Sequence, residues 1–193
     1  MSDANGERTM TLNELLDTVP TYAKDLKLNL STLLQQQELN EQQIWGTVAV
    51  SAIASRNPRL LQTLLAEAAS HLSPQALEAA KSAAAIMGMN NVYYRFQHLA
   101  KNPKYATLPA RLRMNVLRNH GVDPIDFELW CTAVSAINGC GLCVDSHEQV
   151  LRSKGMTEES ILAAVRLASV IHGLAAVFDT EAVVPSQPVP SLT

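Results

Sequence analysis

Glycine, aromatic residues and charged residues are all scarce in this sequence of 193 residues. Glycine contributes 8 residues, Phe, Trp and Tyr together 5%, and charged residues 17%, whereas alanine contributes 25 residues. Alanine is the best helix former, while aromatic side chains are typical of strands. Hydrophobic residues make up 47% of the chain, which is enough to build a core and excludes a disordered chain. The composition therefore predicts a globular all-α protein.

The sequence also lacks the features of membrane, secreted and nucleic-acid-binding proteins. No uninterrupted apolar run approaches the roughly 18 residues that a membrane span needs, and the polar start from Met1 to Arg8 is unlike a secretory signal. Three cysteines are too few for a disulfide scaffold. The net charge is −3 and no long basic cluster occurs, which argues against nucleic acid. We therefore expect a cytoplasmic chain with no membrane and no nucleic-acid partner.

Cap and stop signals divide the chain into helices. Thr11 and Glu14 have the spacing of a capping box, and Ser73-Pro74 and Asp123-Pro124 each pair an N-cap with a proline at the first helical position. Apolar spacing predicts helices at about 11–19, 22–34, 40–55, 58–69, 74–89 or 98, 111–117, 124–137, 141–154 and 158–179. We interpret 11–181 as a single all-helical domain. A flexible N-terminus at 1–10 precedes it, and a Pro-rich, non-helical tail at 182–193 follows it.

A weak internal repeat with an offset of 84 residues divides this domain. Residues 50–53 and residues 134–137 share the sequence Val-Ser-Ala-Ile, and the helix start at Ser73 aligns with the one at Thr157. The repeat predicts two related helical units, about 11–98 and 121–181, joined by a connector at about 99–120.

Reactive side chains are concentrated in the second unit. Cys140 and Cys143 form a Cys-x-x-Cys sequence at the start of an expected helix, where the helix dipole stabilises a thiolate. His147 lies one turn after Cys143 on the same helix face, so its imidazole can accept the Cys143 proton. Glu128, on the preceding helix, would reach His147 if the two helices form an antiparallel hairpin. This arrangement is typical of thiol redox chemistry.

Two other interpretations fit the same residues. Two cysteines and a histidine are zinc ligands, although no fourth ligand with a recognisable spacing occurs. The cysteines could also be inert and buried, as we expect of Cys131, which lies on an apolar helix face. His172 lies in an apolar run and is expected to be a hydrogen-bonded core residue.

The segment from Glu128 to Gly155 resembles the AhpD alkyl hydroperoxidase family, within the wider carboxymuconolactone decarboxylase-like group. The resemblance rests on the pattern of Glu128, Cys140, Cys143 and His147 in an all-helical chain with an unequal repeat. It implies an AhpD-like helical fold and a cytoplasmic, commonly trimeric protein that reduces organic hydroperoxides.

The resemblance also implies roles and partners. Cys143 would be the attacking thiolate, Cys140 its resolving partner, and His147 with Glu128 a proton relay. Dihydrolipoamide on a lipoylated dehydrogenase subunit would supply electrons, which can pass on to an AhpC-type peroxiredoxin. No tightly bound cofactor and no metal are expected. The position of His147 agrees with Cys143 as the nucleophile, whereas the helix dipole favours Cys140, which lies nearer the helix start.

One residue departs from the family pattern, and other functions compete. Some AhpD proteins carry a histidine where this chain has Leu142, so one member of their relay is missing here. The same cysteines would serve a general dithiol–disulfide oxidoreductase or an electron adaptor to a peroxiredoxin. A non-catalytic or zinc-binding helical module is a further alternative. A decarboxylase-like enzyme is disfavoured, because that branch generally does without Cys-x-x-Cys.

Overall fold

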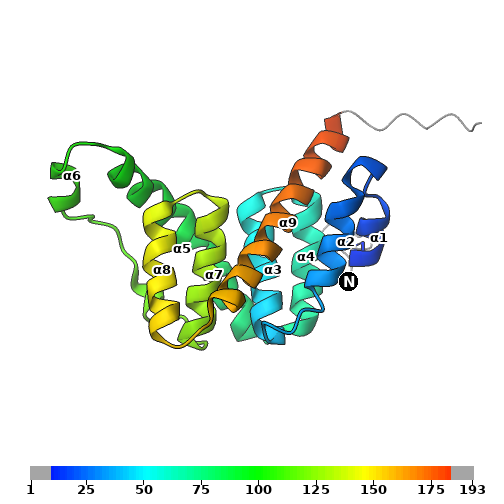
Figure 1. The fold of residues 1–193 in the computed structure, drawn as a ribbon, viewed down its shortest axis with the longest axis horizontal. Helices are drawn as coiled ribbons and strands as arrows, with labels where there is room; N and C mark the ends of the chain where they lie inside the picture. Colours follow the sequence, from blue (N-terminus) through cyan, green and yellow to red (C-terminus); the bar gives the residue numbers. More distant parts are fainter. Residues whose placement is uncertain (1–9, 184–193) are drawn as a thin grey trace, which may run out of the picture.

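The computed structural model of this chain describes residues 10–183, which contain nine α-helices, two short 3-10 helices and no β-strand (Figure 1). The N-terminal elements are α1 (Leu12–Asp17), the 3-10 helix η1 (Thr21–Ala23) and α2 (Lys24–Leu33). Next come α3 (Glu41–Ser55), α4 (Pro58–His71) and α5 (Pro74–Leu99), then α6 (Lys104–Thr107) and the 3-10 helix η2 (Asn115–Leu117). The last three are α7 (Pro124–Ile137), α8 (Gly141–Ser153) and α9 (Glu158–Val183). The predicted all-α class is confirmed.

The helix bounds follow the internal repeat. The order α3, α4, α5 recurs as α7, α8, α9, and α5 and α9 both contain 26 residues. Adding 84 to the bounds of α5, 74 and 99, gives the bounds of α9, 158 and 183. The two related helical units are therefore a feature of the fold as well as of the sequence.

Several helices begin where side chains satisfy the free N–H groups of the first turn. The predicted capping box is present, because the Thr11 hydroxyl accepts from the Glu14 backbone and the Glu14 carboxylate accepts from the Thr11 backbone. Asn40 and Gln43 form a second capping box at the start of α3. A proline occupies the first position of α4, α5 and α7. These local signals account for the agreement between predicted and observed helix starts.

Helix α3 lies at the centre of the molecule. It packs against α4, α5, α7 and α9, and residues 44–52 of this helix are all buried. A helix can bury its whole circumference only when neighbours surround it. Gly46 of α3 lies against the Trp130 indole of α7, at a distance that leaves no room for a Cβ atom. The joint between the two units is thus closely packed around a buried tryptophan.

Helix α9 is long and apolar enough, by length and composition alone, to cross a membrane. However, 61% of its most apolar 18-residue window is buried inside the protein, where α9 packs against α2, α3 and α7. The sequence analysis considered only uninterrupted apolar runs, and a mostly buried helix does not contradict its expectation that no segment spans a membrane. The apolar run of α9 is interrupted by Arg166, Ser169 and His172. Its mean hydropathy, 2.0, is nevertheless as high as that of a membrane-spanning helix. By its packing, α9 is a core helix of this fold.

Three expectations were wrong in detail. The helix expected at 111–117 is only the turn of η2, since Arg111 has a left-handed φ of 53° that breaks a helix. Helix α9 continues through Val183, two residues into the expected tail, because the first proline comes only at position 185. The His172 ring is exposed and contacts the Ser55 hydroxyl at 3.3 Å, so it is no core residue. The expectations for 1–9 and 184–193 lie outside the described residues.

Candidate active site

The two cysteines lie where α7 turns back into α8. Asn138 ends α7, and Gly139 reverses the chain with a left-handed φ of 65° that a glycine adopts without strain. Cys140 is the N-cap of α8, and Cys143 lies in its first turn. The two residues form a disulfide with a Cα–Cα distance of 5.3 Å. The structure therefore places the Cys-x-x-Cys sequence at a helix N-terminus, as predicted.

Glu128 and His147 meet across the α7–α8 hairpin. The Glu128 Oε2 atom lies 2.6 Å from His147 Nδ1, and both side chains are partly buried. Because the carboxylate accepts the Nδ1 proton, it fixes the orientation of the ring and directs Nε2 toward the other side. The contact that required an antiparallel hairpin is thus present.

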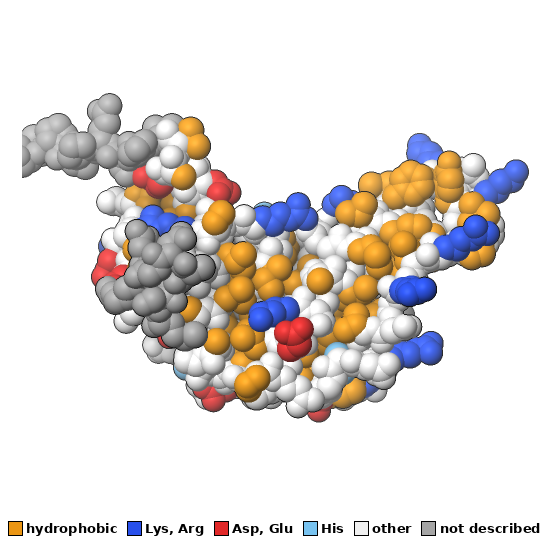
Figure 2. Space-filling view, turned by 180° about the vertical axis from the view of Figure 1, so that it is seen from behind, with side chains coloured by type: hydrophobic (Ala, Val, Ile, Leu, Met, Phe, Trp, Pro, Cys, Tyr) orange, Lys and Arg blue, Asp and Glu red, His pale blue; other side chains and the backbone are white. Residues whose placement is uncertain are grey.

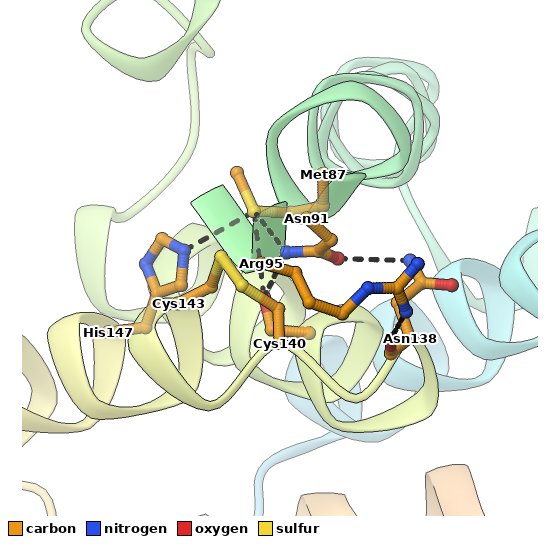
Figure 3. Close-up of a disulfide and its surroundings, with 8 residues drawn as sticks. Met87, Asn91, Arg95, Asn138, Cys140, Cys143 and His147 are labelled. Atoms are coloured by element: carbon orange, nitrogen blue, oxygen red, sulfur yellow. Dashed lines mark hydrogen bonds between the residues drawn. A yellow bond between two sulfur atoms is a disulfide. The ribbon is translucent and has the colours of Figure 1, made fainter. Parts of the chain in front are cut away.

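The second nitrogen of His147 faces a residue that the sequence analysis did not identify. His147 Nε2 lies 3.3 Å from the Sδ atom of Met87, a buried residue of α5 (Figure 3). A thioether sulfur can only accept a hydrogen bond, so this contact is a hydrogen bond only when Nε2 carries a proton. A methionine in an alanine-rich helix looks like an ordinary core residue, and no signal in the sequence pointed to it.

A buried polar network holds α5 against the end of α7. Asn91 Nδ2 donates to the Ser135 hydroxyl at 2.9 Å, and Asn138 Nδ2 donates to Asn91 Oδ1 at 2.9 Å. Arg95 donates to the Asn138 carbonyl at 2.5 Å (Figure 3). These bonds satisfy polar groups that would otherwise be costly to bury. They also fix the turn from which the cysteine pair begins.

A pocket of about 390 Å³ opens beside the disulfide. Its lining residues come from α5, the connector and α8: Met87, Asn90, Tyr94, Met114, Leu117, Leu142, Cys143, Ser146 and His147. Cys143 lines the pocket and is 6% exposed, whereas Cys140 is 0% exposed. A small organic molecule in this largely apolar pocket would therefore meet Cys143 first.

The equivalent place in the first unit has different side-chain contacts. The offset of 84 aligns Arg59 with Cys143 and Phe178 with Tyr94. The Arg59 guanidinium lies over the Phe178 ring, 5.3 Å from its centre, and Asn57, the N-cap of α4, donates to Asp179 of α9 at 2.7 Å. A cation–π contact thus joins the residues that align with Cys143 and Tyr94 of the pocket.

The third cysteine is set apart from this chemistry. Cys131 is fully buried, and burial raises the pKa of its thiol well above the ordinary value, with the Glu128 carboxylate as a second cause. Its expected role as a small core residue agrees with this environment. Among residues 10–183, no group of three or more His, Cys, Asp or Glu side chains has the arrangement of a metal site.

Comparison with known proteins gives consistent matches. Residues 103–184 match the model of the carboxymuconolactone decarboxylase family. The chain is 65% identical to a Solibacter usitatus protein called alkyl hydroperoxide reductase AhpD, over 90% of this chain and 98% of that protein. Proteins of the same name from Acidobacterium capsulatum and Koribacter versatilis are 63% and 64% identical. The matches cover 90% of this chain and 96% of the first protein, and 89% of this chain and 89% of the second.

Proposed function

This chain belongs to the AhpD family, and on that premise we propose that it reduces alkyl hydroperoxides to alcohols with its cysteine pair. The observation that supports the proposal best is the arrangement around Cys143. Its sulfur lines a largely apolar pocket, and the His147 ring, held by Glu128, lines the same pocket. A nucleophile, a base and a residue that orients the base are the parts that activated thiols require.

In the proposed oxidative half-reaction, His147 takes the proton of the Cys143 thiol. The thiolate attacks the terminal oxygen of the hydroperoxide, the O–O bond breaks, and the alkoxide leaves as the alcohol after taking a proton. Cys143 becomes a sulfenic acid, which the Cys140 thiol attacks to form the disulfide and release water. Two thiols and one hydroperoxide thus give one disulfide, one alcohol and one water.

The environments of the two sulfurs support different roles for them. Cys143 lines the pocket, so it meets the peroxide, while the fully buried Cys140 is suited to resolve the sulfenic acid. As the N-cap of α8, Cys140 also lies where the helix dipole stabilises a leaving thiolate. The helix dipole would therefore assist the release of Cys140, whereas His147 would assist the attack by Cys143.

We propose dihydrolipoamide as the reductant. One of its thiolates would attack the accessible Cys143 sulfur and release Cys140 as a thiolate, and its second thiol would then displace Cys143 and leave as lipoamide. In the disulfide form, His147 Nδ1 contacts the Glu128 carboxylate and Nε2 contacts the Met87 thioether, and both groups are able to accept a hydrogen bond from a protonated ring. A protonated His147 would be ready to return a proton to Cys143.

The family also supports proposals about partners. A lipoylated dehydrogenase subunit would deliver the dithiol, and an AhpC-type peroxiredoxin would be a second electron acceptor. Leu142 is 41% exposed at the pocket, next to Cys143, where an apolar side chain favours contact with a partner protein over proton transfer. The proposed setting is a cytoplasmic homotrimer with no tightly bound cofactor.

A single-turnover experiment tests the peroxidase proposal. The reduced protein is mixed with cumene hydroperoxide, and free thiols are counted over time. We expect wild type to lose two thiols per chain, Cys143→Ser to lose none, and Cys140→Ser to form a sulfenic acid that dimedone traps on Cys143. His147→Gln should slow the reaction by about 10²-fold, the usual contribution of a general base.

The Cys131→Ala variant is the control and should react like wild type. Thiol loss at the wild-type rate in Cys143→Ser would contradict the proposed nucleophile, and an unchanged rate in His147→Gln would contradict the proposed base.

A further inference from the structure

Asn90 of α5 has a polar side chain whose position the fold does not explain. It lines the same pocket as Cys143 and His147 and is 4% exposed. Its Oδ1 atom is buried and has no hydrogen-bond partner among the described residues. Its neighbour Asn91, by contrast, is satisfied by Ser135 and Asn138. A buried amide oxygen without a partner costs free energy, and native proteins contain few such groups.

The internal repeat shows what this position requires structurally. The offset of 84 aligns Asn90 with Leu174 of α9, which is fully buried in the core. It also aligns Met87 with Ile171 and Tyr94 with Phe178, and both of these α9 residues are buried. On α9, this helix face is thus packed with hydrocarbon side chains. In the other unit, where the face borders the pocket, the same positions carry an amide, a thioether and a phenol.

Among the polar side chains that line the pocket, Asn90 is the buried one, whereas Ser146 is exposed and the Tyr94 hydroxyl donates to Met114 Sδ at 3.8 Å. Most of the pocket lining is apolar, and His147 already contacts Glu128 and Met87. An –OOH group has one proton to donate and two oxygens that accept. A side-chain amide matches both needs, because it carries an acceptor oxygen and a donor NH₂ group.

We propose that the Asn90 amide binds the –OOH group of the substrate and directs its terminal oxygen toward the Cys143 sulfur. The inference rests on the proposed peroxidase function and adds to it the residue that distinguishes a hydroperoxide from other apolar ligands. Asn90 takes no proton and forms no covalent bond. It contributes a hydrogen bond that the dithiol reductant, which has no –OOH group, does not use.

The test measures the two half-reactions separately in wild type, Asn90→Leu and Asn90→Ala. Leucine is the residue at the equivalent position of α9 and has the same branched arrangement of side-chain heavy atoms, although it is larger, whereas alanine leaves the pocket open. Oxidation of the reduced protein by tert-butyl and by cumene hydroperoxide should slow by about tenfold in both variants, the effect of one hydrogen bond. Reduction of the disulfide by dihydrolipoamide should change by less than about twofold.

Thermal unfolding provides a second readout that separates a binding role from a structural one. Because Asn90→Leu removes an unsatisfied buried amide, its melting temperature should rise while its peroxide rate falls. Val92→Ala, a change at an exposed residue on the same helix that does not line the pocket, is the matched control and should alter neither half-reaction.

Three results would overturn the inference. An unchanged peroxide rate in both Asn90 variants would show that the amide does not bind the substrate. An equal slowing of both half-reactions, with a lower melting temperature, would assign Asn90 a structural role. A wild-type protein that no hydroperoxide oxidises would reject the proposed function itself, together with this inference.

Discussion

Three cysteines in one chain lie in three different environments, and these environments decide their chemistry. Cys143 lines the pocket beside His147, and Cys140 caps a helix where a thiolate is stabilised. Cys131, a residue of α7, is buried in the core of the protein, and this burial raises the pKa of its thiol well above the ordinary range. Since the thiolate is the reactive form, these environments favour redox chemistry at Cys140 and Cys143 and disfavour it at Cys131.

We therefore predict that Cys131 does not react in the folded protein. After reduction, native protein at pH 8 should show two thiols that react quickly with Ellman's reagent. A third should appear only in denaturant, because Cys131 is both inaccessible and held as the neutral thiol. The variant Cys131→Ala should show the same two fast thiols and lack the third. Three fast thiols in folded wild type would contradict this assignment.

The site was predictable where it depends on local geometry. Helical periodicity places His147 on the face of Cys143, and a single hairpin brings Glu128 to His147. Met87 and Asn90 come from α5, about 50 residues earlier in the chain, and their side-chain types are common in helix cores. Only the tertiary packing of α5 against α7 and α8 shows that they border the pocket.

At the scale of elements, the contact between α3 and α7 joins the two units. Gly46 allows the Trp130 indole to lie directly against the α3 backbone, and both residues are buried. Gly88 of α5 differs, because a Cβ atom added there would meet no atom within 4 Å. The two helical glycines thus have opposite structural roles.

Substitution of these glycines by alanine should change stability in opposite directions. Gly46→Ala should lower the free energy of unfolding by about 2 kcal/mol, because the added methyl group displaces Trp130 in a closely packed core. Gly88→Ala should raise it by about 0.5–1 kcal/mol, because alanine is the better helix former and the space is open. Urea denaturation of both variants measures the difference. A Gly46→Ala variant as stable as wild type would contradict the close packing described here.

The elements differ in how well local sequence determines them. Helices that begin with a capping side chain or a proline were predicted at their observed starts, since these signals act within one turn. The local structure within the connector was not predicted correctly, because Arg111 adopts a left-handed backbone conformation that nothing in the sequence requires. Its path depends on contacts beyond its own residues.

At the scale of the whole molecule, the connector extends from the helical body as an arm (Figure 1). Apolar side chains are exposed along it and at the end of α5, among them Leu99, Tyr105, Leu108 and Leu112, interspersed with lysines and arginines (Figure 2). Between residues 79 and 122 the sequence has no Asp or Glu. Exposed apolar side chains grouped in this way are typical of interaction surfaces.

We predict that this arm holds the chains of a trimer together. Sedimentation equilibrium should give three times the 21.0 kDa mass of the chain. Leu108→Glu should shift the mass toward one chain, because it places a charge on an apolar surface that becomes buried on association. Val183→Glu alters another exposed apolar residue, at the end of α9 far from the arm, and should leave the mass unchanged (Figure 1). A wild-type mass of 21.0 kDa would contradict the prediction.

The central claim is that Cys143 transfers electrons from a lipoyl dithiol to an alkyl hydroperoxide. The most direct test follows hydroperoxide consumption with dihydrolipoamide and its dehydrogenase as the reducing system, in wild type and Cys143→Ser under identical conditions. We predict steady turnover in wild type and none in the variant. No turnover in wild-type protein with confirmed free thiols, or equal turnover in both proteins, would contradict the claim.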